Sequence, residues 1–184
     1  MKRVVVALVL ALFGFSALAA DEVPAPKGMV LLTVGGLVGK PNRGPFDPKH
    51  DTLLAKLSAD FKHGFEFDRD MLLALPQGTV KAKPIEFENE ATFKGPVLHE
   101  VLGFIEAAVA KTTFVAADGY SGYLLPADIR ASDYILALEA DGKPLGLGQQ
   151  GPLWLMNTRK DGEAAGKDNR GSHVWALVYM HIGE

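Results

Sequence analysis

The 184 residues carry 19 basic and 22 acidic side chains, a formal net charge of −3, and no cysteine. A mildly acidic chain without a basic patch argues against nucleic acid as its main partner, because phosphate binding needs clustered Lys and Arg. The absence of cysteine excludes a disulfide, a thiolate nucleophile and a thiolate metal ligand.

Residues 1–19 are predicted to be a cleavable signal peptide. Lys2 and Arg3 precede a continuous apolar run, and small residues at 16–19 (SALA) supply the cleavage site, before Ala20 or Asp21. The run is shorter than the ~20 residues that span a bilayer. Without a paired arginine or a lipid-bearing cysteine, the signal indicates general secretion in an unfolded state. We therefore expect a periplasmic or secreted protein with no membrane anchor after cleavage.

An extended leader is expected over 20–28, followed by one domain over 29–184. Short β-rich runs bounded by Gly, Pro and Asp-Gly turns predict strands at 30–33, 80–83, 91–93, 112–116, 134–138, 153–156 and 174–182. Apolar residues at helical spacing predict helices over 50–61 and 97–110, and a short helix that begins at an Asp68 N-cap and ends at Pro76. Residues 161–171 form a polar excursion. This pattern has no alternation of strand and helix, which makes the fold class α+β.

Six short motifs stand in a particular order along the chain. They are 42–47 (NRGPFD), 75–76 (LP), 93–98 (FKGPVL), 117–120 (ADGY), 141–145 (DGKPL) and 151–154 (GPLW). In this order they resemble the oxidoreductase molybdopterin-binding domain, the fold of sulfite oxidase, and most closely its short, secreted, single-domain branch. The resemblance implies a β-rich, mixed-sheet α+β fold.

The family's metal ligand is missing from this chain. In the enzymes that it resembles, molybdenum is held by a pterin dithiolene and by one cysteine between the LP and F-x-G-P-x-L motifs. The matching segment 77–92 (QGTVKAKPIEFENEAT) has none, and its acids Glu86, Glu88 and Glu90 are interpreted as a solvated face. Such enzymes also receive their cofactor before export, which does not suit unfolded secretion. We therefore expect no bound cofactor, although the resemblance makes molybdopterin the candidate.

Four residues are the candidates for ligand binding. The family's loop at Asn42 and Arg43 approaches the pterin, and an arginine there suits an anionic group; the alternative is an arginine that pins the loop. The family's loop at Asp118 and Tyr120 lies beside the cleft, although Asp118, followed by Gly119, is most simply a turn residue. None of the five histidines has a zinc spacing, and no serine has a G-x-S-x-G setting, so the sequence predicts no metal site and identifies no catalytic residue.

The sequence thus favours a periplasmic small-ligand-binding or interaction module of this superfamily that has lost its molybdenum. Its expected partner is a small ligand, anionic if Arg43 contacts it, or a periplasmic or membrane protein. Two alternatives stay open: an oxidoreductase that holds molybdopterin without a covalent ligand, and an accessory sensor for a membrane signalling protein.

Overall fold

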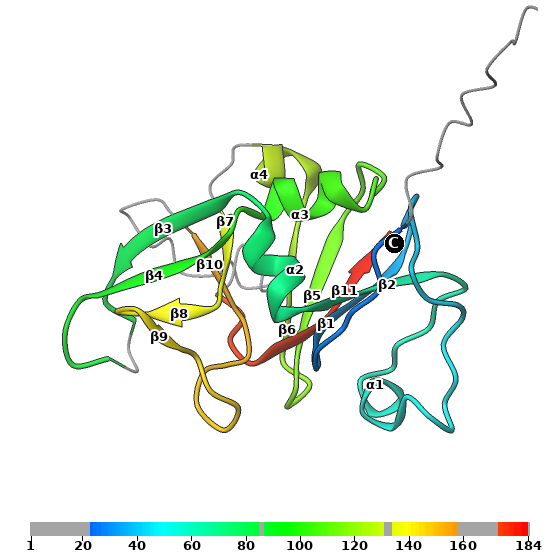
Figure 1. Ribbon diagram of the computed structural model, residues 1–184, viewed down its shortest axis with the longest axis horizontal. Coiled ribbons are helices and arrows are strands. Elements are labelled where there is room, and N and C mark those ends of the chain that lie inside the picture. Colours follow the sequence, from blue (N-terminus) through cyan, green and yellow to red (C-terminus); the bar gives the residue numbers. More distant parts are fainter. Residues whose placement is uncertain (1–22, 85–86, 131–133, 158–172, 184) are drawn as a thin grey trace, which may run out of the picture.

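The computed structural model describes residues 23–84, 87–130, 134–157 and 173–183. The predicted signal peptide, Glu86 and the excursion at 161–171 lie outside the described residues. In the described part the chain is a β-rich domain with mixed sheets and four short helices (Figure 1). Among these residues, no helix is both long and apolar enough to cross a membrane.

The largest sheet brings the two ends of the domain together (Figure 1). Its strands are β1 (Val30–Gly36), β2 (Gly64–Asp68), β5 (Thr112–Ala116), β6 (Ser121–Leu124) and β11 (Leu177–Ile182), in the order β2-β1-β11-β5-β6. The first strand pairs with the last in parallel, and the other pairs are antiparallel. Alternate residues such as Leu32, Phe65 and Phe114 fill the main core on one face.

Two smaller sheets build the other half of the domain. One contains β3 (Gln77–Ala82), β4 (Ala91–Pro96), β8 (Glu139–Ala140) and β9 (Lys143–Pro144), and the other pairs β7 (Tyr134–Ala137) with β10 (Trp154–Asn157). They enclose a second core around Phe93 and Trp154, whose rings meet edge to face with centroids 5.4 Å apart. Gly95 explains part of the FKGPVL motif, because a Cβ there would overlap the carbonyl of Leu136.

The helices are shorter than their hydrophobic spacing predicts. They are α1 (Thr52–Lys56), α2 (Arg69–Ala74), α3 (Leu98–Phe104) and α4 (Pro126–Arg130). The predictions of helices over 50–61 and 97–110 were wrong at their ends, because Ser58 and Glu106 adopt left-handed φ angles of 57° and 51° that stop each helix. The Asp68 N-cap is confirmed: its carboxylate accepts the Met71 amide at 2.9 Å.

The predicted strands are all present, with ends shifted by a few residues, and the fold class is confirmed as β-rich and mixed. Five elements were missed, namely β2, β6, β8, β9 and α4. Helix α3 covers the main core on one face of the large sheet, where Leu98, Val101 and Ile105 are buried. The opposite face of the sheet holds a third, smaller core in which Leu54 and Phe61 from the α1 region pack on Tyr179 of β11.

Candidate functional site

Arg43 lies on the loop between β1 and α1, with its guanidinium between two carboxylates. Nη2 donates to Asp51 at 2.7 Å and Nη1 donates to Glu66 at 2.8 Å, and the side chain is 16% exposed. The guanidinium carbon also lies 5.0 Å from the centroid of the Phe61 ring. Burial opposes the charge, but the hydrogen bond to Asp51 and the charges of Glu66 and Asp51 raise the pKa of Arg43. These contacts fit the alternative of an arginine that pins its loop.

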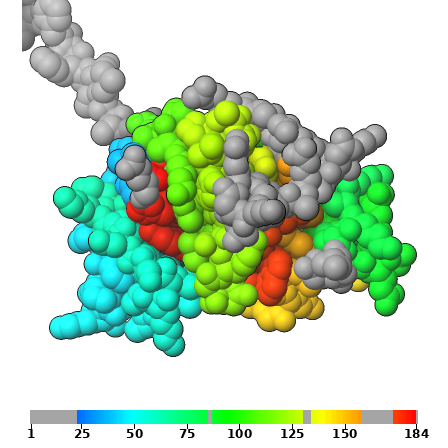
Figure 2. Space-filling view, turned by 180° about the vertical axis from the view of Figure 1, so that it is seen from behind, coloured from blue at the N-terminus to red at the C-terminus, as the bar shows by residue number. Residues whose placement is uncertain are grey.

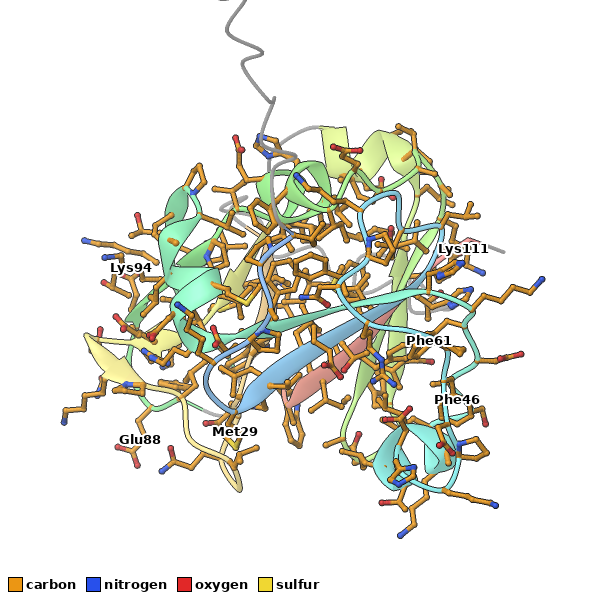
Figure 3. The ribbon with its side chains drawn as sticks, turned by 45° about the vertical axis from the view of Figure 1, so that its right-hand side comes forward. Met29, Phe46, Phe61, Glu88, Lys94 and Lys111 are labelled. Atoms are coloured by element: carbon orange, nitrogen blue, oxygen red, sulfur yellow. The ribbon has the colours of Figure 1, made fainter. Side chains whose placement is uncertain are left out.

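The side chain of Asn42 also forms hydrogen bonds within the protein. Its amide nitrogen donates to the carbonyls of Pro24 and Glu66, each at 2.9 Å, and its amide oxygen accepts the Glu66 N–H at 2.7 Å. Asn42 therefore ties the leader to β2. Aromatic side chains also pack beside this loop. The centroids of the Phe46 and Phe61 rings lie 6.0 Å apart, on the side of the molecule that carries α1 (Figure 3).

Asp118 and Tyr120 lie in a different place, at the tip of the hairpin that joins β5 and β6. Gly119 has a φ of 91°, which suits the turn, and Asp118 Oδ1 accepts the Tyr120 amide at 2.9 Å. Both side chains line a cleft of about 370 Å³. Asn42 and Arg43 are not among its lining residues, so the structure separates the four predicted residues into two pairs.

The rest of the cleft comes from distant parts of the sequence. Trp154 of β10 and Trp175, just before β11, line it with His173, and Pro84 and Ala116 complete the wall. Figure 2 shows the yellow-green β5–β6 hairpin beside the red surface that precedes β11. Sequence analysis singled out neither tryptophan nor His173 as a site residue. The one signal for Trp154 is its position at the end of the GPLW motif.

The indole of Trp154 has an unused hydrogen-bond donor. Trp154 is 1% exposed, and its Nε1 atom is buried without an acceptor among the described residues. A buried donor without a partner costs roughly 1–3 kcal/mol, and native proteins keep such groups rarely.

His173 is tied to the end of β10. The Asn157 amide donates to His173 Nε2 at 3.2 Å. Asp118 is the one Asp, Glu, Lys or Arg among the described residues that line the cleft. Those residues combine one carboxylate, three aromatic rings and one imidazole.

A second cleft, of about 390 Å³, opens on the other face of the large sheet. Val115 lines it, whereas the next strand residue, Ala116, lines the first cleft. Here the Tyr179 hydroxyl lies 3.2 Å from His181 Nδ1. Burial, with a smaller effect of Asp60, raises the pKa of Tyr179 to about 12, and burial lowers the pKa of His181. Both shifts favour the neutral forms of the two side chains, and the Tyr179 ring stacks on Phe61 as part of the third core.

Metal-binding clusters were sought over the part of the chain that the structure describes. There, no three His, Asp or Glu side chains come close enough together to hold a metal ion. Glu88 and Glu90, which follow β3, are exposed to solvent.

Comparison with known proteins shows that this chain resembles a solved structure in its fold. No protein-family model matches the sequence, and no curated protein matches it significantly. Among solved structures, the sulfane dehydrogenase SoxCD from Paracoccus pantotrophus matches with a TM-score of 0.50 and 16% sequence identity. The match covers 84% of this chain but only 38% of the SoxCD chain.

At this identity the match speaks for the fold alone. It supports a distant molybdopterin-oxidoreductase-like fold, in line with the resemblance noted in the sequence. The chain spans well under half of the neighbour's length, so the activity of that enzyme is not carried over. The residues present do not fit the family's cofactor anchor either, because the chain contains no thiolate to bind molybdenum.

Proposed function

We propose that this protein is a periplasmic small-ligand-binding protein built on a sulfite-oxidase-type fold without thiolate-bound molybdenum. The cleft between the β5–β6 hairpin and β10 is its binding site. Ligand clefts are typically concave and lined by aromatic side chains with a few polar groups that fix orientation. A cleft lined by Tyr120, Trp154 and Trp175 together with Asp118 has this composition.

The observation that carries the proposal is the lining of the cleft. The exposed rings of Tyr120 and Trp175 and the Asp118 carboxylate, from separate parts of the sequence, come together around one concave space. The positive charge of Arg43, by contrast, is compensated by ion pairs with Asp51 and Glu66. The loop at 42–47 is therefore a poor binding site for an anionic ligand. The fold likeness to SoxCD supports the scaffold in this proposal and says nothing of the ligand.

Intrinsic fluorescence tests the proposal directly, because both tryptophans of the protein line the cleft. We expect at least one of neopterin, sulfite, phosphate, choline and glycine betaine to shift the emission and raise the Tm of the secreted protein. Trp175→Leu, which removes an exposed indole ring from the wall of the cleft, should weaken that ligand about fivefold.

The matched control is Phe93→Leu, which changes the ring packed against Trp154 without removing a cleft group. It should lower stability and leave affinity unchanged. The proposal fails if none of the five compounds binds, and the role of Trp175 fails if its Leu variant binds as well as the wild type.

Molybdenum content separates this proposal from the enzymatic alternative. Protein purified from its native periplasm is expected to contain no stoichiometric molybdenum, since no cysteine is available to hold the metal. Elemental analysis of the intact protein measures this without any assay of activity. A content near one atom per chain would instead establish an oxidoreductase that retains molybdopterin by non-covalent contacts.

A further inference from the structure

The charge of the cleft indicates the class of ligand. Asp118 contributes a carboxylate, and no Lys or Arg is found among the described residues that line the cleft. Only one oxygen of Asp118 is used by the hairpin, in accepting the Tyr120 amide. The second oxygen can face a ligand. A small cation gains from this carboxylate, whereas an anion is repelled by it.

Aromatic rings provide the second attraction for a cation. Tyr120 and Trp175 line the cleft while remaining 43% and 39% exposed, and Trp154 lines it from the buried side. The electron-rich faces of Tyr and Trp attract cations, with Trp the strongest. Three such rings and one carboxylate around a single cleft are the combination that recognises methylated ammonium groups.

We infer that the cleft binds a small molecule that carries a methylated ammonium group. This inference rests on the proposed function of the same cleft. The ammonium lies against Tyr120 and Trp175 beside Asp118. A methylated ammonium presents methyl groups to the rings and has no N–H donors to satisfy.

Three probes of nearly the same shape isolate the effect of charge. Choline carries a trimethylammonium group and a hydroxyl acceptor, 3,3-dimethylbutan-1-ol replaces the charged nitrogen with carbon, and 3,3-dimethylbutanoate carries a negative charge instead. Calorimetric titration of the secreted protein with each should show choline binding at least about fivefold more tightly than the neutral alcohol. The butanoate should bind more weakly than either.

Variants assign this preference to residues. Asp118→Asn keeps an oxygen for the Tyr120 amide but removes the charge, and should weaken choline about fivefold while leaving the neutral alcohol unchanged. Trp175→Leu should weaken choline about three- to tenfold. The control is Asp141→Asn in the other Asp-Gly hairpin, whose carboxylate accepts the Thr92 amide away from the cleft. It should bind choline as the wild type does.

The outcomes separate this inference from the proposed function. Equal affinity for choline and the alcohol, tighter binding of the butanoate, or no effect of Asp118→Asn would each overturn the cationic ligand while a binding cleft remained. Failure of both choline and glycine betaine to bind would also overturn it. The proposed function itself falls only if neopterin, sulfite and phosphate fail to bind as well.

Discussion

Replacing Arg43 with Met is expected to lower the free energy of unfolding by about 3 kcal/mol, because it leaves two partly buried carboxylates without their shared cation. Asp51 and Glu66 approach the guanidinium at 2.7 and 2.8 Å from separate elements. The same substitution removes the cation from the face of Phe61. Arg43→Lys should be intermediate in stability, since one ammonium cannot serve both carboxylates with the geometry of the guanidinium fork.

Urea denaturation followed by tryptophan fluorescence measures this loss. Arg69→Met is the matched control, because Arg69 forms a single, more exposed ion pair with Glu139 at 2.8 Å. Its loss should cost no more than about 1 kcal/mol. If Arg43→Met were as stable as wild type but bound its ligand more weakly, Arg43 would be a ligand-binding residue and the loop-pinning interpretation would be wrong.

The strands of this fold could be predicted because their signals are local. Alternating β-formers bounded by turns mark β5 and β11, and the Asp-Gly pairs at 118–119 and 141–142 correctly mark two hairpins. The N-cap at Asp68 could also be predicted, since the capping hydrogen bond joins residues three apart in the sequence. These features depend on neighbours in the sequence, which the sequence itself displays.

The helix ends could not be read in this way. Leu53, Leu54 and Leu57 keep helical spacing, but the chain leaves the helix after Lys56 so that Phe61 can pack on Tyr179 of β11. That contact lies between residues far apart in the sequence. The same reason hides β2, which has only five residues and is defined by its pairing with β1.

The residues of the candidate site also fall into two groups: those that a local motif predicts, and those that only the folded chain brings together. Asp118 and Tyr120 follow from one short motif, and the structure places both in one cleft. Trp154 and Trp175 join them only because β10 and the start of β11 meet the hairpin in three dimensions, which no spacing along the chain reveals. The unpaired indole N–H is likewise invisible in the sequence, because it depends on which acceptors surround a buried ring. Whether Asn42 and Arg43 bind a ligand stays a prediction that the Arg43 variants test.

Asp68→Ala is expected to destabilise the protein by about 3 kcal/mol, because one buried carboxylate accepts three backbone amides. It accepts Met71 at 2.9 Å as the N-cap of α2, and it accepts Lys27 and Gly28 of the leader at 2.7 and 2.8 Å. Asp68→Asn, with a single acceptor oxygen, should lose about half as much. Asp70→Asn, one residue into the same helix, is the control and should change stability little.

The dependence of this effect on pH distinguishes a charged acceptor from simple packing. The hydrogen bonds from Met71 and Gly28 lower the pKa of Asp68 in the folded protein against the opposing effect of burial, and the hydrogen bond from Lys27 adds a smaller lowering. A carboxyl group with a lowered folded pKa contributes its full stability above the unfolded pKa of about 3.9. That contribution disappears as the pH falls through the folded pKa. The stability difference between wild type and Asp68→Asn, measured by urea denaturation, should therefore be constant from pH 7 to about 5 and shrink below about 4. A difference that stayed unchanged in acid would mean that the side chain acts through its shape, and the three amide bonds to a charged carboxylate would not be what secures the leader and α2 to the large sheet.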